Sequence, residues 1–345
     1  MTDLWQTIRE SKKPIYLYGT GNGADLVIDK MSSVGVTPCG IFASDGFVRG
    51  QSFRGFTVKS YSEVKSSEKD FIIVVAFGSS LPEVRENVMR MAEEHELYIA
   101  DAPVYGNTFF DKDYVSVNKR NLKLIYDSLA DSRSREVFEN VVKFKTSGKI
   151  NHLFASEDNE ENTLLEIFKL KENATIFDLG AFIGDTAEKF ASLWPDYGKI
   201  VAVEPSVKNF SRLKSTAEKI RNTVCVNAAI SYLNGSIFFD NEGGRNQAAH
   251  SGNTVTESIT IDTLSHRFGA PDFIKFDIEG EELNGIIGGE ETIKKYKPAL
   301  LVSAYHRSED IVNIPTKILS LRNDYKMYVR HFPCIPCWDT YYLFI

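Results

Sequence analysis

The sequence predicts an α/β protein made of two parallel-sheet domains. Each half of the 345-residue chain opens with an apolar strand, a glycine-spaced turn and a helix, near residues 14–34 and again within 175–205. Apolar strands alternate with helices in both halves, as in parallel sheets covered by helices. A chain with 43% hydrophobic residues at this length can bury two cores. We expect a Rossmann-like domain at 1–105, a helical linker at 106–150 and a larger α/β domain at 151–345.

The N-terminal domain begins with the strand PIYLY and the turn GTGNGA. Gly19, Gly21 and Ala24 fit the G-x-G-x-x-A spacing of a nucleotide-binding turn, and Asp45 ends the second strand about 20 residues later. Because this spacing is common, two interpretations stay open: a site for a nucleotide or nucleotide-sugar, or a structural or docking domain. The further elements expected are a helix at 23–34, strands at 39–45 and 71–80, a helix at 81–95 and the strand LYIADAP.

Two helices are predicted for the linker, at 118–130 and 132–146. Their apolar residues recur at helical spacing, among them Leu122 and Ile125 in the first helix and Phe138 and Val141 in the second. We assign these residues to packing.

The most informative segment of the chain is 175–205, which contains DLGAFIGDT. Gly180 and Gly184 bracket a turn at the end of an apolar strand, and Glu204 ends the next strand, placed to accept ribose hydroxyls. Phe182 stands where a dinucleotide turn needs its second glycine, so that the backbone can approach the pyrophosphate. The segment therefore favours S-adenosylmethionine, which has an adenosine but no phosphate to cradle. The alternative is an ordinary βαβ unit whose glycines only make the turn.

A second segment, PDFIKFDIEG at 271–280, reads as a buried strand followed by a helix over 281–296. The period of a strand points Lys275, Asp277 and Glu279 to one side. Further strands are expected at 175–178, 200–204, 223–227, 273–277 and 299–304, with a closing antiparallel pair at 325–330 and 340–345.

The polar, Gly-rich stretch from Ser236 to Ile261 interrupts the alternation of strands and helices. It is long for a connection, and long irregular segments in compact domains are usually functional, so it predicts a lid over the cofactor or acceptor. Ser251 and Asn253 are its candidates for substrate contact, against the simpler interpretation of a solvated loop.

These motifs resemble the FkbM family of S-adenosylmethionine-dependent methyltransferases, over about residues 153–345. The resemblance rests on DLGAFIGDT, VAVEPSVKNF, VNAAI, ITIDTL, IKFDIEGEEL, KKYKPALLVSAYHRSEDIVNIP and YKMYVRHF. It implies a class I methyltransferase sheet with an antiparallel C-terminal hairpin, and methylation of hydroxyl groups in glycan or natural-product pathways. Phe182 departs from the family, whose commoner members carry a small polar residue there. The N-terminal domain is similar to the Rossmann-like domains of sugar-modifying acyltransferases.

The candidate site residues follow strands, where ligands of open α/β sheets bind. Methyl transfer to a hydroxyl needs removal of its proton, and His306, with an ordinary pKa of about 6.5, is the predicted general base. A structural histidine at a strand end is the alternative. Asp277 and Glu279 either orient His306 or hold a divalent cation, Lys275 acts in catalysis or neutralises Asp277, and His331 is a second candidate base. The candidate cofactor-binding residues are Asp178, Gly180, Ala181, Phe182, Gly184, Asp185, Thr186, Glu204, Pro205, Asn227 and Asp277.

Composition narrows the partners and the compartment. A net charge of −7 argues against nucleic acid and against an anionic membrane surface. No apolar run reaches the length of a membrane span, and the start MTDLWQTIRESKK lacks the apolar stretch of a signal peptide, so we expect a cytoplasmic protein. Cys334 and Cys337 form CIPC without a second pair, which reads as a loop with incidental thiols rather than a zinc site.

The sequence thus predicts an S-adenosylmethionine-dependent O-methyltransferase acting on a sugar or other polyol. An N-methyltransferase on the same fold is one rival. Another is an NAD-dependent oxidoreductase of nucleotide-sugars that uses the N-terminal turn. The third is a non-catalytic protein that binds a sugar nucleotide. The acceptor, the need for a metal and the oligomeric state are not predicted.

Overall fold

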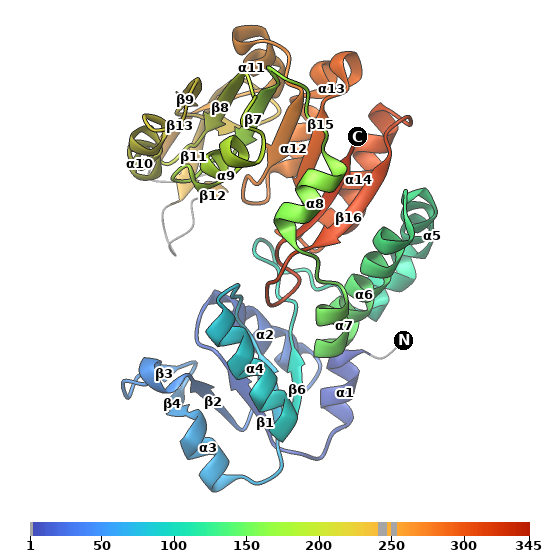
Figure 1. Ribbon diagram of the computed structural model, residues 1–345. Coiled ribbons are helices and arrows are strands. Elements are labelled where there is room, and N and C mark those ends of the chain that lie inside the picture. Colours follow the sequence, from blue (N-terminus) through green and yellow to red (C-terminus); the bar gives the residue numbers. More distant parts are fainter. Residues whose placement is uncertain (1–2, 241–246, 250–253) are drawn as a thin grey trace.

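The computed structural model describes residues 3–240, 247–249 and 254–345 of the chain. Two α/β bodies lie one above the other, the N-terminal one in blue and the C-terminal one in green to red, with α5, α6 and α7 beside their junction (Figure 1). Within these residues, no helix is both long and apolar enough to span a membrane. The division of the chain at residues 105 and 150 stays a prediction.

The first sheet has six strands in the order β3-β4-β2-β1-β5-β6, parallel except for the short β3. Residues of β1 alternate between its faces: Ile15 and Leu17 pack with α1 and α2, whereas Tyr16 and Tyr18 join the core beneath α3 and α4. The predicted strands and helices are present here, with ends that differ by a few residues. Their bounds are α1 Leu4–Glu10, β1 Ile15–Tyr18, α2 Asn22–Ser33, β2 Gly40–Ala43, β3 Ser52–Phe53, β4 Phe56–Ser60, α3 Tyr61–Ser67, β5 Ile72–Val75, α4 Pro82–Glu94 and β6 Glu96–Ile99.

Four helices connect the two sheets, where the sequence predicted two. The first starts earlier than expected because Asp111 caps it, accepting hydrogen bonds from the amides of Asp113 and Tyr114. The second ends at Gly148, whose φ of 65° lies in the left-handed region that favours glycine. The helices are α5 Lys112–Ser128, α6 Ser132–Ser147, α7 Ile150–Ala155 and α8 Glu160–Ile167.

The second sheet has seven strands in the order β16-β17-β15-β14-β7-β8-β9. Five are parallel, and β16 and β17 form the predicted antiparallel pair at one edge, so the fold class is confirmed. The strands are β7 Thr175–Leu179, β8 Lys199–Val203, β9 Thr223–Val226, β14 Phe273–Phe276, β15 Ala299–Ser303, β16 Met327–His331 and β17 Thr340–Phe344. The helices are α9 Asp185–Leu193, α10 Val207–Ala217, α11 Ile261–Phe268, α12 Glu282–Ile287, α13 Glu290–Tyr296 and α14 Asp310–Leu321.

Two predictions for this half need correction. The stretch proposed as an irregular lid instead contributes strands to a small sheet of order β10-β13-β11-β12. The strands of this sheet are β10 Ala229–Ile230, β11 Gly235–Asp240, β12 Gln247–Ala249 and β13 Thr254–Ile259. Ser251 and Asn253 lie outside the described residues. The helix predicted over 281–296 is broken into α12 and α13, because Gly288 packs so closely on the carbonyl of Ser231 that a Cβ there would lie 2.2 Å from its oxygen.

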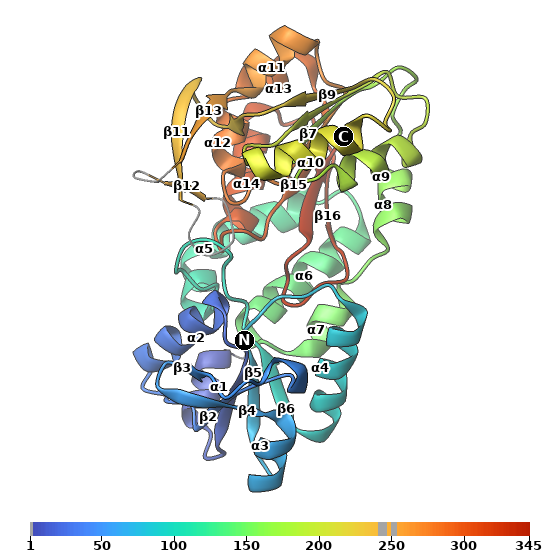
Figure 2. The ribbon, with the colours of Figure 1, turned by 90° about the vertical axis from the view of Figure 1, so that its left-hand side faces the viewer.

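The loop between β16 and β17 reaches from the second sheet to the first, as the dark red segment shows in both orientations (Figures 1 and 2). Ser79 and Ile335 exchange backbone hydrogen bonds of 2.7 and 3.0 Å. Trp338 lies against Gly78, where a Cβ would be 1.9 Å from the ring, and its indole N–H donates to the carbonyl oxygen of Ala102 at 3.3 Å. This loop therefore joins the two halves of the chain.

The two thiols of the same loop, which the sequence analysis treated as incidental, are buried. Cys334 and Cys337 are free cysteines, and burial raises the pKa of both thiols. Nearby, Lys145 of α6 and Asp101 after β6 form a buried ion pair at 2.6 Å. The CIPC segment thus serves packing between the halves, and its thiols are held in the unreactive protonated form.

Candidate active site

The turn after β7 is built from residues in the left-handed backbone region. Gly180 has a φ of 81°, and a Cβ on it would lie 1.8 Å from the carbonyl oxygen of Asp277, so only glycine fits there. Gly184, at the start of α9, has a φ of 95°. Phe182 adopts a φ of 48°, and half of its surface is exposed. The turn thus brings β7 close to the end of β14 and leaves an aromatic ring at the surface.

Glu204, which follows β8, faces this turn and is only 5% exposed. Its Oε2 accepts a hydrogen bond from the Phe182 amide at 3.0 Å, and its Oε1 accepts one from the Ser206 amide at 2.9 Å. Burial raises the pKa of Glu204, although these two hydrogen bonds act to lower it. Each oxygen still has a second lone pair, so the carboxylate can accept hydroxyl donors as predicted.

A cavity of about 360 Å³ opens at the carboxyl ends of β7, β8 and β14. The predicted cofactor-binding residues that line it are Gly180, Phe182, Asp185, Thr186, Glu204, Pro205 and Asp277. Four others support its walls instead. Ala181 and Asp178 are buried, Gly184 starts α9, and Asn227 donates to the carbonyl oxygens of Glu204 and Pro205 at 2.8 and 3.1 Å.

Lys275 connects two carboxylates beneath the cavity. Its Nζ lies 3.3 Å from Asp178 Oδ1, 3.4 Å from Asp277 Oδ2 and 3.3 Å from the carbonyl oxygen of Gly180. Burial opposes its charge, but the two carboxylates hold the Lys275 pKa above its ordinary value. Burial also raises the pKa of Asp178, which is fully enclosed. Lys275 therefore neutralises buried acids, the structural alternative considered from the sequence.

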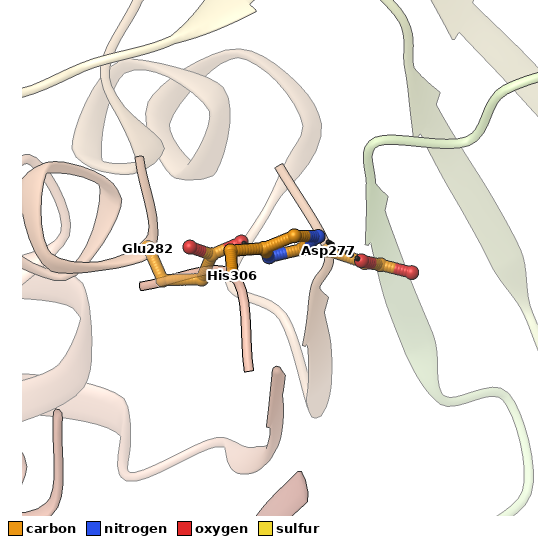
Figure 3. A group of neighbouring side chains, drawn as sticks. All are labelled: Asp277, Glu282 and His306. Carbon is orange, nitrogen blue, oxygen red and sulfur yellow. Dashed lines mark hydrogen bonds and ion pairs between the residues drawn. The ribbon is translucent and has the colours of Figure 1, made fainter. Parts of the chain in front are cut away.

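His306 lies behind the cavity and is 2% exposed. Its Nδ1 is 2.9 Å from Glu282 Oε1, and its Nε2 is 3.5 Å from Asp277 Oδ1 and 3.7 Å from Glu279 Oε2, as Figure 3 shows for the first two carboxylates. Burial works against the charged ring, but Glu282 and the other acids raise the pKa of His306 to about 9. The predicted general base is therefore an imidazolium at neutral pH, and it is not among the residues that line the cavity.

Asp277 faces the cavity, with about a quarter of its side chain exposed. Its Oδ1 accepts hydrogen bonds from the hydroxyls of Ser303 at 3.1 Å and Tyr305 at 3.0 Å. Despite burial, Lys275 and His306 lower its pKa below the ordinary value. Asp277 is thus held as an oriented carboxylate at the cavity wall.

The strand period predicted that Glu279 shares a face with Lys275 and Asp277, but it does not. β14 ends at Phe276, and Glu279 sits in the following turn with a φ of 57°. Half of its side chain is exposed, and it accepts a hydrogen bond from the Tyr105 hydroxyl at 2.8 Å. It still lines the cavity.

His331 is not brought together with His306. It lies at the end of the edge strand β16, fully buried, with Nδ1 3.1 Å from the Thr340 hydroxyl. Burial lowers the pKa of His331 to about 3, so the ring is neutral. The prediction of a second base here is wrong, because the hairpin carries this side chain into the packed contact with residues 156–158 instead.

Ligand atoms of Asp277, Glu282 and His306 lie within 4.8 Å of one another, the spacing of a metal site. The sequence named Asp277 and Glu279 as metal candidates. A cation at the first set would have to displace the proton of His306, since a coordinating imidazole is neutral, and a cation at either set would lie beside the ammonium of Lys275. Lys275 thus opposes a divalent cation at Asp277.

Sequence reasoning missed three contributors to this site. Glu282 pairs with His306 from the start of α12, and the EGEEL motif gave a signal for it, since acids concentrate at helix starts. Tyr305 is adjacent to His306 in the sequence. Tyr105 comes from the segment between β6 and α5, and its amide also donates to the carbonyl oxygen of His306 at 2.9 Å. No local pattern points to Tyr105.

The N-terminal turn does not assemble a comparable set of charged groups. Gly19 has a φ of 126° and packs against the ring of Phe77, and a Cβ on Gly21 would meet open space. Asp45 begins a short 3₁₀ helix and is exposed. The neighbouring ends of β5 and β6 are covered by Trp338, as described above. Binding of a nucleotide here stays a prediction.

The second sheet and its cavity define a class of protein. A mostly parallel sheet closed by an antiparallel hairpin, with an acid after the second strand beside a glycine-bracketed turn, is the Rossmann-like architecture of methyltransferases. Residues 178–327 match the model of the methyltransferase FkbM domain. A methyltransferase function is supported accordingly.

One solved structure extends the likeness to both halves. The chain is similar to the methyltransferase FkbM from Methylobacillus flagellatus KT, with 22% identity, a TM-score of 0.71 and coverage of 99% of this chain and 92% of that chain. It also matches a precorrin-6y C5,15-methyltransferase from Geobacter metallireducens GS-15 at 14% identity, covering 53% of this chain and 85% of that one, with a TM-score of 0.34. No curated protein matches the chain in sequence. The first structure shows the same overall fold.

Proposed function

We propose that this protein is an S-adenosylmethionine-dependent O-methyltransferase that acts on a hydroxyl of a sugar or other polyol, in glycan or natural-product biosynthesis. The observation that carries the cofactor assignment is the buried carboxylate of Glu204 at the edge of the cavity, bonded to the Phe182 amide. The lysine among the described lining residues, Lys275, is already paired with two acids. A cofactor with ribose hydroxyls and a positive charge suits this lining better than a diphosphate.

Each residue at the cavity has a separate task in this proposal. Glu204 accepts the ribose hydroxyls, and the half-exposed ring of Phe182 offers an apolar surface to the adenosine. The cofactor supplies a methyl group on a sulfonium. Asp277 lies on the same cavity, where it meets the acceptor hydroxyl, and Tyr305 and Ser303 fix its orientation.

Asp277 replaces His306 as the proposed proton acceptor. When the hydroxyl oxygen bonds to the methyl carbon and the carbon–sulfur bond breaks, the oxygen becomes far more acidic than a carboxylic acid. A carboxylate with a lowered pKa can therefore take the proton, provided that it is ionised and correctly placed. Lys275 and His306 keep Asp277 ionised. The acceptor loses its proton to Asp277, and the cofactor leaves as a neutral thioether.

The test combines binding and turnover. Calorimetry should show binding of S-adenosylmethionine and S-adenosylhomocysteine, and mass spectrometry of the purified protein should show either one as a retained ligand. With a panel of sugars and polyols as acceptors, Asp277→Asn should keep the affinity for S-adenosylhomocysteine and lose about 10²–10⁴-fold in turnover, the usual value of a positioned acid or base. Asp324→Asn, which changes an acid in a surface turn, is the matched control.

Retained nicotinamide in place of S-adenosylmethionine would instead support the oxidoreductase that uses the N-terminal turn. Methylation of an amine panel with undiminished turnover in Asp277→Asn would support the N-methyltransferase, because an amine needs no such base. Binding of a sugar nucleotide without turnover of any acceptor would support the non-catalytic rival. The cytoplasmic location stays a prediction.

A further inference from the structure

Glu282 is a fully buried carboxylate one layer behind the cavity wall. Its Oε1 accepts a hydrogen bond from the Ile278 amide at 2.9 Å and lies 2.9 Å from His306 Nδ1. Its Oε2 has no hydrogen-bond partner among the described residues. A buried carboxylate is costly unless it is paired, so the contact with the imidazole is the one that compensates for its burial.

The imidazole of His306 lies between two carboxylates. Figure 3 shows Glu282 on one side of the ring and Asp277 on the other. The two contacts use different nitrogens, Nδ1 toward Glu282 and Nε2 toward Asp277 at 3.5 Å. A neutral imidazole carries one N–H, whereas the doubly protonated ring donates from both nitrogens. The Glu282 contact is a hydrogen bond, and the Asp277 contact is at ion-pair distance, so an imidazolium ring would be paired on both sides.

We propose that Glu282 is a positioning residue of the methyltransferase site, which orients His306 and keeps its ring doubly protonated, so that a fixed positive charge stands behind Asp277. The inference rests on the proposed function, because it assigns this charge to the cavity that holds the cofactor. Glu282 itself does not touch that cavity.

Other ionisable groups also surround the His306 ring and affect whether it is charged or neutral. Burial disfavours the cation, and the acids together overcome burial, which raises the pKa of His306 to about 9. Asp310 beside Glu282 is kept from adding a full charge, since burial raises its pKa to about 8. The groups that face His306 are Glu282 from α12, Asp277 and Glu279 after β14, Asp310 from α14, Asp339 from the β16–β17 loop, and the Tyr105 and Tyr305 rings.

A pair of ligands that differ in one charge reports on this cation. S-adenosylmethionine carries a sulfonium where S-adenosylhomocysteine has a neutral sulfur. The sulfonium also lowers the pKa of the ligand's own amino group, so the ratio at each pH is compared between protein variants. An imidazolium near the cavity penalises the sulfonium, so the ratio of affinities, methionine form over homocysteine form, should rise when the ring loses its proton. In the wild type this rise should come as the pH increases through about 9.

The experiment compares wild type, Glu282→Gln and Glu290→Gln, all as full chains. Glu290 is a partly exposed acid on the next helix, paired with Lys294 and Lys317, and serves as the control. We expect NMR of labelled histidine to place the His306 titration near pH 9 in the wild type and the control, and below 6.5 in Glu282→Gln, where burial is no longer opposed by the closest acid. Glu282→Gln removes two opposite charges, the carboxylate and the proton of the ring, so the affinity ratio at pH 7.5 should change little. Calorimetry from pH 7 to 10 should show the ratio rising more in the wild type and the control than in Glu282→Gln, whose ring is already neutral at pH 7.

A wild-type His306 that titrates near 6.5, or a titration that Glu282→Gln leaves unmoved, would overturn the proposal. So would a shifted titration with the same pH dependence of the affinity ratio in the wild type and Glu282→Gln, since the pair would then serve packing alone. If Glu282→Gln does not fold, the wild-type His306 titration decides in its place. If neither ligand binds, the proposed function is refuted. This outcome is distinct from failure of the Glu282 proposal, because the His306 titration is measured without any ligand.

Discussion

Replacement of Glu204 tests the cofactor site most directly. The carboxylate is 5% exposed and already bonded to two backbone amides, so its position is fixed before any ligand binds. Glu204→Ala removes the acceptor for two ribose hydroxyls, and a hydrogen bond to a charged group is worth about 1.5–3 kcal/mol. Because 1.4 kcal/mol corresponds to tenfold in affinity, the loss of even one such bond predicts at least about tenfold weaker binding. The amides of Phe182 and Ser206 also lose their acceptor, which loosens the turn.

The assay is calorimetry with S-adenosylhomocysteine, which needs no acceptor. Glu204→Gln should fall between wild type and Glu204→Ala, because its amide group keeps one oxygen but turns an N–H₂ toward one of the two backbone donors. Glu218→Ala, at the exposed end of α10, is the control and should bind like wild type. Equal affinity in wild type and Glu204→Ala, with both proteins folded by circular dichroism, would refute the assignment.

Two further predictions concern stability. Gly78→Ala should lower the free energy of unfolding in urea by about 1–3 kcal/mol, since its Cβ would lie 1.9 Å from the ring of Trp338. Gly46→Ala is the control, because a Cβ there meets no neighbour. Equal urea midpoints for the two variants would mean that the loop does not stabilise the first sheet. The wild type should lose stability as the pH falls below about 6.5 toward 3, because His331 is neutral when folded, with a pKa of about 3, and takes up a proton on unfolding. In His331→Gln the urea midpoints at pH 5 and 7 should lie closer together than in wild type, and an unchanged gap would assign the acid sensitivity elsewhere.

Local patterns were enough to locate the part of the cavity between β7 and β8. The strand, the turn from Gly180 to Gly184 and the acid at Glu204 are consecutive in the chain, and parallel strands place their carboxyl ends at one edge. The sequence could therefore bring Glu204 and Asp277 to one crevice, and both line the cavity. Asp178, Asn227 and His306 were expected in the same crevice but are not among the residues that line it. The sequence also predicted the edge hairpin from two apolar segments.

The chemistry of His306 could not be read in the same way. Its charge depends on Glu282, which lies 24 positions earlier and becomes its neighbour only in the folded chain. Tyr105 comes from before the helical linker, so its bond to Glu279 spans 174 positions. The break between α12 and α13 is set by the carbonyl of Ser231, again a distant contact. Identity and spacing predict which side chains reach a site, whereas their protonation depends on neighbours that only packing supplies.

The loop between β16 and β17 also affects the order in which the two halves can fold during synthesis. A ribosome makes the first sheet long before the segment with Ile335 and Trp338, which pairs with Ser79 and covers Gly78. We expect the nascent N-terminal half to expose the ends of β5 and β6 until that segment has been made. Contact between the two halves is thus a late step of folding, and a chain that stops before residue 332 would keep its first sheet permanently open at that end.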